Sequence, residues 1–443
     1  MRKFRWQPIV LGCAVPLLWS VVVPAFGATD PPAVLIPPDY NTFVPPGVGA
    51  SYADPVFGTV IKRSSDAPNM PNNFTGSGML AWVTTEYSTV NPFNRNGSRL
   101  ILQHQGYYGL YDGNGTYLQD LPFAVNAATG PRWSRTDANV LYYVKWVSPT
   151  SQNRLMRLDV STGTSSLVHF FNEYAIISGE GESDISRDGD HLVLAGDNRY
   201  VFVYEISTDT KGPVLDTDLG CVYPGYPPPC FNNLYIAPNN SVAIGWLPAG
   251  AGRFKGVELF GSDMVFQRQL THAIGHQHLA RDTNGDDLLV WNNSGDPAPP
   301  IFCPNGIVKV RLSDAHQTCL LPLDWSLAVH ITASDGNGWV FVETYDPADP
   351  PASLPAWKLY TNEILKVKLD GTGETQRLLH HRSRQTANYE YQPRATVSRD
   401  GRKLVYTSNY GLQAILGYPT WYTDVYFVAV PPIEDIIFSD GFE

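Results

Sequence analysis

Short apolar segments separated by polar turns recur along the whole chain. In "VSRDGRKLVYTS" (397–408) and "ISRDGDHLVLAG" (185–196), a short strand-like segment leads into an Asp-Gly turn and an alternating apolar segment follows. Five further copies bring the number to seven, and their second turn residues are Gly97, Asp137, Gly189, Asn240, Gly285, Gly336 and Gly401. Because Asp-Gly and Asn-Gly turns adopt positive φ and favour tight hairpins, each copy predicts a β-hairpin.

Further apolar strands lie between the hairpins. They are seen most clearly at 154–160, 200–206, 306–312 and 363–371. No long stretch has the 3.6-residue periodicity of a capped helix, so we expect very little helix. One hairpin and two further strands per unit, repeated seven times, predict an all-β fold, a seven-bladed β-propeller. The irregular spacing of the turns predicts long loops on its faces.

The two ends of the chain predict how the ring closes. The segment 423–430 is expected to be a strand of the last blade, and 55–64 is expected to supply the outer strand of the same blade. The chain then divides into a signal peptide (1–27), an N-terminal extension (28–54), the propeller (55–431) and an acidic C-terminal tail (432–443). The alternative is a β protein of two domains.

The first residues have the pattern of an export signal. A basic start is followed by an apolar run over 9–23 and by small residues at Ala25 and Gly27. The run is short for a membrane span, which needs about 20 residues. A lipoprotein signal ending at Cys13 is the alternative. With no later apolar span, the sequence predicts an exported protein, periplasmic or extracellular, without a transmembrane segment after cleavage.

The net charge limits the kinds of binding partner we expect, and the cysteines indicate the cellular compartment. The formal net charge is -11, and removing the basic signal makes the chain more acidic, which argues against nucleic acid as a partner. Four cysteines remain beyond the signal: Cys221, Cys230, Cys303 and Cys319. Sequence leaves three pairings open, of which the two local pairs close short loops, and disulfides agree with an oxidising compartment.

In a propeller, the strand before each turn is the innermost and lines the central channel. The residues about seven positions before the turns are Asn91, Arg132, Glu182, Asn233, His278, His330 and Arg394. His276 and Gln392 lie two positions further upstream, on the same strand faces as His278 and Arg394. A purely structural lining would be small and apolar. This polar set therefore predicts a site at one mouth of the channel.

Several motifs in the second half resemble the TolB-like propellers, and among them oligogalacturonate lyase and its relatives. They are "HITASDGNGWVFVETY", "TNEILKVKLDG", "RLLHHRS" and "QPRATVSRDGRKLVYTSNYG". The resemblance implies a histidine base at His278, or at His276 if the register differs, and a metal-binding histidine at His330. The family takes further ligands, a glutamine and two histidines, from the last inner strand. Here Tyr389, Gln392 and Arg394 occupy that spacing.

This departure changes the expected metal site, because a guanidinium has no lone pair to offer. The remaining metal candidates are His276, His278, His330 and Gln392. A divalent metal, either manganese, calcium or zinc, is the expected cofactor if one binds.

The same residues fit the chemistry of uronate elimination. That reaction needs a base, a cation on the substrate carboxylate and a proton donor for the leaving oxygen. His278 is the expected base, Arg394 or Arg132 the carboxylate clamp, and Tyr391 or Tyr389 the donor. Glu182 and Asn233 are expected to bind substrate beside them.

The sequence therefore predicts a carbohydrate-active propeller, a lyase acting on uronate-containing glycans. The alternative is a non-catalytic TolB-like propeller that binds an anionic glycan or a protein.

Overall fold

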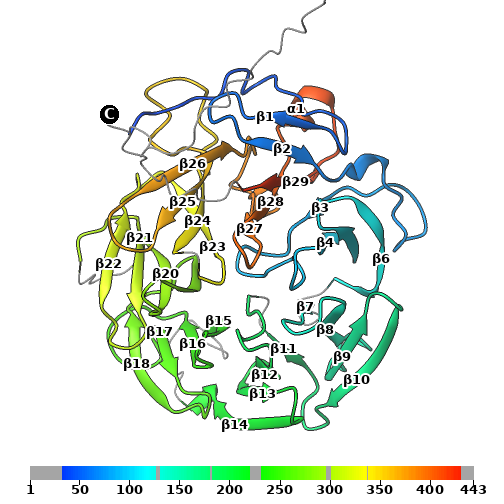
Figure 1. The fold of residues 1–443 in the computed structure, drawn as a ribbon, viewed down its shortest axis with the longest axis vertical. Helices are drawn as coiled ribbons and strands as arrows, with labels where there is room; N and C mark the ends of the chain where they lie inside the picture. Colours follow the sequence, from blue (N-terminus) through cyan, green and yellow to red (C-terminus); the bar gives the residue numbers. More distant parts are fainter. Residues whose placement is uncertain are drawn as a thin grey trace, which may run out of the picture.

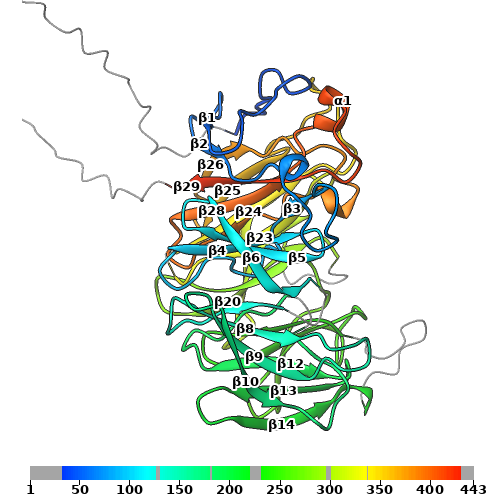
Figure 2. The ribbon, with the colours of Figure 1, turned by 90° about the vertical axis from the view of Figure 1, so that its right-hand side faces the viewer.

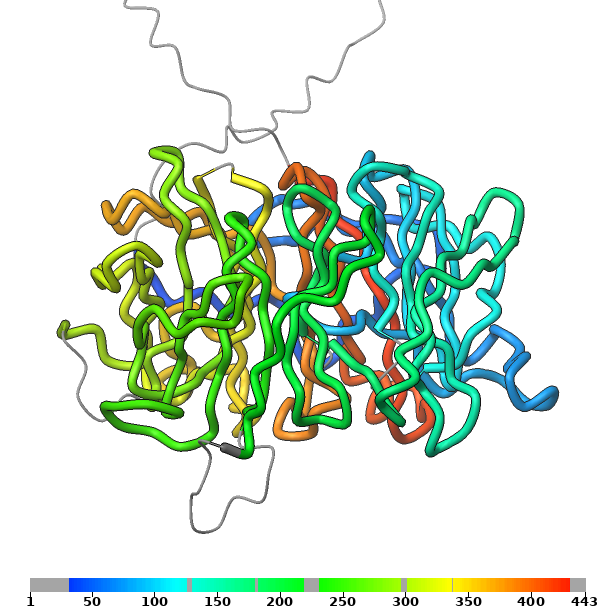
Figure 3. The backbone as a smooth tube through the Cα atoms, turned by 90° about the horizontal axis from the view of Figure 1, so that it is seen from below, coloured from blue at the N-terminus to red at the C-terminus, as the bar shows by residue number. Residues whose placement is uncertain are grey.

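The computed structural model describes residues 32–125, 130–179, 182–219, 231–295, 301–336 and 338–430. Seven antiparallel sheets surround a central axis as the blades of a β-propeller (Figure 1). The edge-on views show a disc in which the strands run between the two faces (Figures 2 and 3). The predicted all-β, seven-bladed fold is confirmed.

Each of the first six blades takes four consecutive strands, the first of which lies innermost. The first blade contains β3 (Val83–Thr84), β4 (Arg99–His104), β5 (Tyr107–Asp112) and β6 (Tyr117–Ala124). The second contains β7 (Arg132–Trp133), β8 (Val140–Lys145), β9 (Arg154–Asp159) and β10 (Thr164–Phe170). The third contains β11 (Ile177–Ser178), β12 (His191–Gly196), β13 (Tyr200–Glu205) and β14 (Thr210–Asp216).

The fourth to sixth blades follow the same order. The fourth contains β15 (Phe231–Ile236), β16 (Val242–Trp246), β17 (Gly256–Phe260) and β18 (Phe266–Thr271). The fifth contains β19 (Gln277–Arg281), β20 (Asp287–Asn293), β21 (Gly306–Arg311) and β22 (Gln317–Leu321). The sixth contains β23 (Ala328–Ala333), β24 (Trp339–Tyr345), β25 (Glu363–Lys368) and β26 (Thr375–His380).

The last blade joins the two ends of the chain, as predicted. Its strands are β27 (Thr396–Val397), β28 (Lys403–Ser408) and β29 (Asp424–Ala429) from the C-terminal side, with β2 (Val60–Arg63) and β1 (Ser51–Ala53) from the N-terminal side. β2 pairs antiparallel with β29, so main-chain hydrogen bonds close the ring. β1 extends this sheet to residues before the predicted propeller start at 55.

Helical segments are short in the described part of the chain. They are one α-helix, α1 (Leu412–Leu416), and three 3-10 turns, η1 (Ala67–Asn69), η2 (Thr217–Leu219) and η3 (Tyr389–Tyr391). No helix among these residues is long and apolar enough to cross a membrane. Six of the seven predicted turn residues have positive φ, from 64° at Asn240 to 101° at Gly336; Asp137 is the exception.

The hydrophobic core lies between neighbouring blades rather than within one. One cluster, for example, joins Leu288 and Val290 of the fifth blade to Ile331 and Val342 of the sixth. Central strands such as β24 are therefore buried on both faces, whereas the outermost strand β10 is largely exposed. This explains why the second strand of each predicted hairpin is so rich in apolar residues.

One disulfide joins Cys303 to Cys319 in the fifth blade. This is one of the two local pairings left open by the sequence. Cys221 and Cys230 lie outside the described residues, as do the predicted signal peptide and the acidic tail.

The described part of the N-terminal extension packs on the sixth blade. Arg377 donates to the carbonyl oxygen of Ala33 (2.8 Å), and Asn362 donates to the hydroxyl of Tyr40 (2.8 Å). The ring of Tyr40 meets that of Trp357 edge to face. The extension is thus part of the folded disc from at least Ala33 onward.

Candidate functional site

The inner strands bring the predicted residues to the channel, but they distribute them between its two sides. The side of the channel on which the inner strands begin is called the start side. The opposite side, on which they end at the seven hairpin turns, is called the turn side. The start-side cluster consists of Tyr87, His276, His330, Glu343, Tyr345, Tyr389 and Arg394. The turn-side pocket is lined by residues that include Glu182, Asp184, Arg187, His278, Asp335 and Arg399.

His276 is held in one tautomer by the neighbouring blade. Its Nδ1 contacts the carbonyl oxygen of Val329. A carbonyl can only accept, so Nδ1 carries the proton and the Nε2 lone pair is free. Burial, with a smaller contribution from His330, lowers the pKa of His276 to about 4. The imidazole is therefore neutral at neutral pH and can take a proton at Nε2.

His330 is held by a carboxylate directly across the sheet. Glu343 is its register partner on β24, and its Oε1 lies 3.3 Å from His330 Nδ1. Burial acts to raise the pKa of Glu343, but His330, His381 and the backbone N–H of Ala395 together outweigh it, so the pKa is lowered. His330 Nε2 is buried without a hydrogen-bond partner. An unsatisfied ring nitrogen thus lies in the cluster, beside the stacked ring of His276 at 4.6 Å.

Arg394 is a buried cation without a carboxylate partner in the described residues. It is 3% exposed, its Nη2 donates to Thr84 Oγ1 (2.7 Å), and its Nε is buried without a partner. The guanidinium lies 4.8 Å from the ring centre of Tyr389, which is 50% exposed. Arg394 also has a φ of 45°, a conformation that costs free energy for a non-glycine residue and often marks functional sites. Because a buried unpaired charge is unfavourable, this position is suited to an anionic ligand.

The start-side cluster does not fit the expected metal. The rings of His276 and His330 stack face to face, with 18° between their planes, so their nitrogens do not converge on one point. Gln392 donates its amide to the carbonyl oxygen of Thr386 (3.3 Å), and the cation of Arg394 would repel a second positive charge. Among the described residues, no group of three or more His, Cys, Asp or Glu side chains is arranged to hold a metal ion.

His278 lies on the turn side and has the opposite tautomer. The backbone N–H of Ala333 donates to its Nδ1 (2.6 Å). Nδ1 is therefore unprotonated, and Nε2 carries the proton. Burial lowers the pKa of His278 to about 4, so this ring is a neutral hydrogen-bond donor at Nε2. The two histidines of this strand therefore differ: the lone pair is on Nε2 in His276, whereas Nε2 of His278 carries the proton.

Glu182 is a deeply placed carboxyl group of the turn-side pocket. The hydroxyl of Tyr235 donates to its Oε2, and the amide of Asn233 lies 3.5 Å from the same oxygen. Burial raises the pKa of Glu182 to about 7, against the opposing effect of these two hydrogen bonds. Glu182 and Asn233 thus lie together, and the carboxylate of Glu182 also acts to raise the pKa of Tyr87 in the start-side cluster.

Replacing Glu182 with Gln is expected to change how stability depends on pH. A raised carboxyl pKa stabilises the fold at low pH, and this contribution is lost as the pH rises from about 4.5 to about 7. The wild type and the Gln variant should therefore have the same free energy of unfolding near pH 4.5. Above about pH 7 the Gln variant should be the more stable, by at most about 3 kcal/mol. Urea denaturation at both pH values measures this. An equal difference at both values would contradict the raised pKa.

Two predicted residues, Arg132 and Tyr391, have other partners. Arg132 pairs with Glu86 (3.0 Å) and donates to the carbonyl oxygen of Ser183 between the second and third blades. The hydroxyl of Tyr391 accepts the backbone N–H of Trp421 (3.0 Å), which makes Tyr389 the better-placed tyrosine near Arg394.

Sequence reasoning missed several groups of both sites. Glu343 lies on the second strand of its blade, where a search of inner strands does not look, although "VFVETY" contains the only charged residue of that apolar strand. Tyr87 precedes its turn by ten residues, since the first blade has a longer inner segment. Arg187, Asp335 and Arg399 belong to the turns themselves, where charge is the ordinary expectation.

Solved structures with the same architecture include two lyases. An oligogalacturonate lyase in complex with manganese aligns with a TM-score of 0.58 and 15% identity, covering 88% of this chain and 97% of that chain. The oligogalacturonate lyase of Vibrio parahaemolyticus aligns with a TM-score of 0.56 and 12% identity, covering 86% and 96%.

No protein-family model and no curated protein matches the chain. The fold and the channel thus define a seven-bladed propeller of the architecture seen in oligogalacturonate lyases. The resemblance predicted from the sequence motifs is confirmed at the level of the fold.

Proposed function

We propose that this chain is a glycan lyase that cleaves a uronate-containing polysaccharide or oligosaccharide by β-elimination in the start-side cluster. The observation that carries the proposal is the buried, unmatched guanidinium of Arg394 in one cluster with the free Nε2 of His276. The first is a site for a carboxylate and the second is a site for a proton. Uronate elimination needs both on one sugar ring.

In the proposed reaction, Arg394 binds the carboxylate of the uronate. It stabilises the negative charge that develops on this carboxylate when the proton on the adjacent carbon, C5, is removed. His276 Nε2 removes that proton from C5. The electron pair forms the C4–C5 double bond, and the bond from C4 to the linking oxygen breaks. Tyr389 gives its hydroxyl proton to the leaving oxygen, and proton transfer from the imidazolium restores the tyrosine.

Local electrostatics support these roles. Burial keeps His276 neutral before substrate binds, and a bound carboxylate favours the imidazolium that the reaction forms. The half-exposed ring of Tyr389 lies 4.8 Å from the guanidinium of Arg394, which supports Tyr389 as the proton donor in this proposal. In this proposal the guanidinium of Arg394 supplies the positive charge that a metal cation would otherwise supply. The structurally similar oligogalacturonate lyase was solved in complex with manganese.

We also propose that the protein acts outside the cytoplasm on an anionic glycan. The disulfide between Cys303 and Cys319 supports an oxidising compartment. The basic, apolar and small-residue order of the first 27 residues supports export.

The direct test is an assay of the full chain on a panel of polyuronates, followed through the ultraviolet absorbance of the unsaturated uronate product. Activity is expected on at least one substrate, and EDTA should leave it unchanged because Arg394 supplies the positive charge. Loss of activity with EDTA would overturn the role of Arg394. Absence of product on every polyuronate would instead favour a propeller that binds glycan without cleaving it.

A further inference from the structure

The turn-side pocket contains a charge network that is not used in the proposed reaction. Arg135 and Arg399 share Asp184, at 4.0 and 3.0 Å, and Arg135 also pairs with Asp335 (2.6 Å). Both aspartates therefore have arginine partners. Residues of four blades meet here, because Arg135, Asp184, Asp335 and Arg399 each follow the inner strand of a different sheet.

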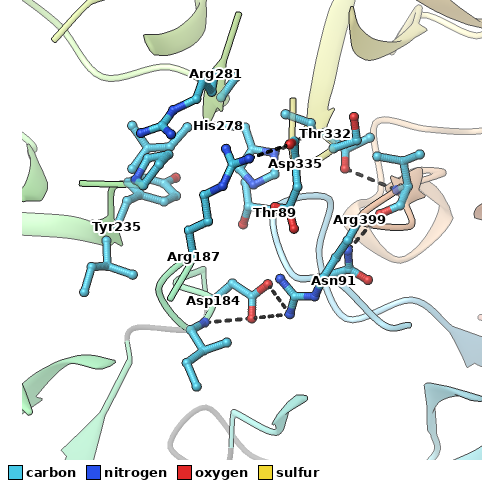
Figure 4. Close-up of a pocket in the computed structure, with 18 of the residues that line it drawn as sticks. Thr89, Asn91, Asp184, Arg187, Tyr235, His278, Arg281, Thr332, Asp335 and Arg399 are labelled. Atoms are coloured by element: carbon cyan, nitrogen blue, oxygen red, sulfur yellow. Dashed lines mark hydrogen bonds and ion pairs between the residues drawn. The ribbon is translucent and has the colours of Figure 1, made fainter. Parts of the chain in front are cut away.

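The donors of the pocket are not all used. Arg187 extends into the pocket and donates from Nη2 to the backbone carbonyl oxygen of Asp335 (3.1 Å), and no carboxylate among the described residues pairs with it (Figure 4). The side chain of Arg399 is 9% exposed, and its Nε is buried without a partner. The hydroxyl of Ser334 is buried and also has no partner. Two buried donors without a partner, Arg399 Nε and Ser334 Oγ, and the exposed guanidinium of Arg187 thus line one pocket whose aspartates already have arginine partners.

The pocket opens to solvent, and the space over its lining residues, bulk solvent included, is about 680 Å³. Arg187 is exposed, whereas the side chain of Arg399 and Ser334 are largely buried. Two guanidinium groups and a hydroxyl, all donors, match a ligand that carries a carboxylate beside hydroxyl groups.

We propose that the turn-side pocket is a second ligand site that binds a small hydroxylated carboxylate, such as a uronic acid monosaccharide. Arg187 and Arg399 hold the carboxylate, and Ser334 donates to it or to an adjacent hydroxyl. This site is independent of the start-side chemistry, because none of these three residues belongs to the start-side cluster.

Calorimetric titration of the full chain with galacturonate, and with galactose as the neutral control, tests the site. The experiment uses the Arg394→Gln background, so that a carboxylate bound on the start side does not contribute. Galacturonate is expected to bind and galactose is not. Adding Arg187→Gln should weaken binding roughly tenfold or more, since a charge-assisted contact is lost.

Arg402→Gln is the matched control, because Arg402 is an exposed arginine on the turn that follows Arg399 and does not line the pocket. It should bind galacturonate as the background does. Equal affinity with and without Arg187 would overturn the site, and so would an absence of binding in the Arg394→Gln background. Binding that Arg394→Gln alone abolishes would also overturn it while leaving the proposed lyase intact.

Discussion

Replacing His276 with Ala is expected to reduce the rate of uronate cleavage by about 10²–10⁴-fold, the range that general-base catalysis contributes. The substitution removes the nitrogen whose lone pair the Val329 carbonyl leaves free. Because the ring is partly exposed rather than part of a hydrophobic cluster, the fold should survive its loss. The measurement is the initial rate of formation of the unsaturated product, with circular dichroism to verify folding.

His278→Ala is the matched control. His278 lies two residues along the same strand, is also neutral, and has the opposite tautomer. If the backbone partners decide which nitrogen can take a proton, His278→Ala should keep most of the activity. The reverse result, with His278→Ala inactive and His276→Ala active, would return the base to the turn side and contradict the proposed site.

Replacing Arg63 with Met is expected to destabilise the propeller by about 3–5 kcal/mol, the cost of leaving a buried charge without its partner. Arg63 is on β2, the N-terminal strand that closes the ring, and it donates to Asp424 Oδ2 from Nε (3.1 Å) and Nη2 (2.7 Å). Asp424 is completely buried and also accepts from Ser65, the Ala67 backbone and Tyr422. Urea denaturation measures the free energy of unfolding.

Arg157→Met provides the comparison for this effect. Arg157 and its partner Asp137 are 40% and 49% exposed and 3.7 Å apart, so their ion pair should contribute at most about 1 kcal/mol. An Arg63→Met variant as stable as Arg157→Met would show that β-strand pairing alone closes the ring. A double variant, Arg63→Met with Asp424→Leu, should recover part of the loss, because it removes the unpaired carboxylate as well.

Much of the fold could be predicted because its signals are local. A turn residue with positive φ and an alternating apolar strand follow from a few neighbouring residues, and six of the seven turns have the expected conformation. Ring closure could be predicted as well, since an unpaired strand at each end of the chain must find a partner. β2 and β29 provide it.

The sites were harder to predict because they depend on contacts between blades. Strand periodicity places His276 and His278 on one face, and both do contact the sixth blade. Periodicity does not predict that His276 contacts a carbonyl oxygen and His278 a backbone N–H, because these partners lie more than fifty residues further along the chain. The same limit applies to Arg394, whose lack of a carboxylate partner is visible only when every neighbouring strand is in place.

The sequence by itself determined the seven-bladed ring, its closure by both ends of the chain and a channel lined with polar residues, because turn geometry and hydrophobic alternation are properties of short segments. Only the tertiary structure decided that these residues form two separate sites, and which imidazole nitrogen carries a proton. Those properties arise from the height of each side chain along the channel and from its partner on the next blade. Each blade is a separate segment of the chain, so neither can be read within one repeat.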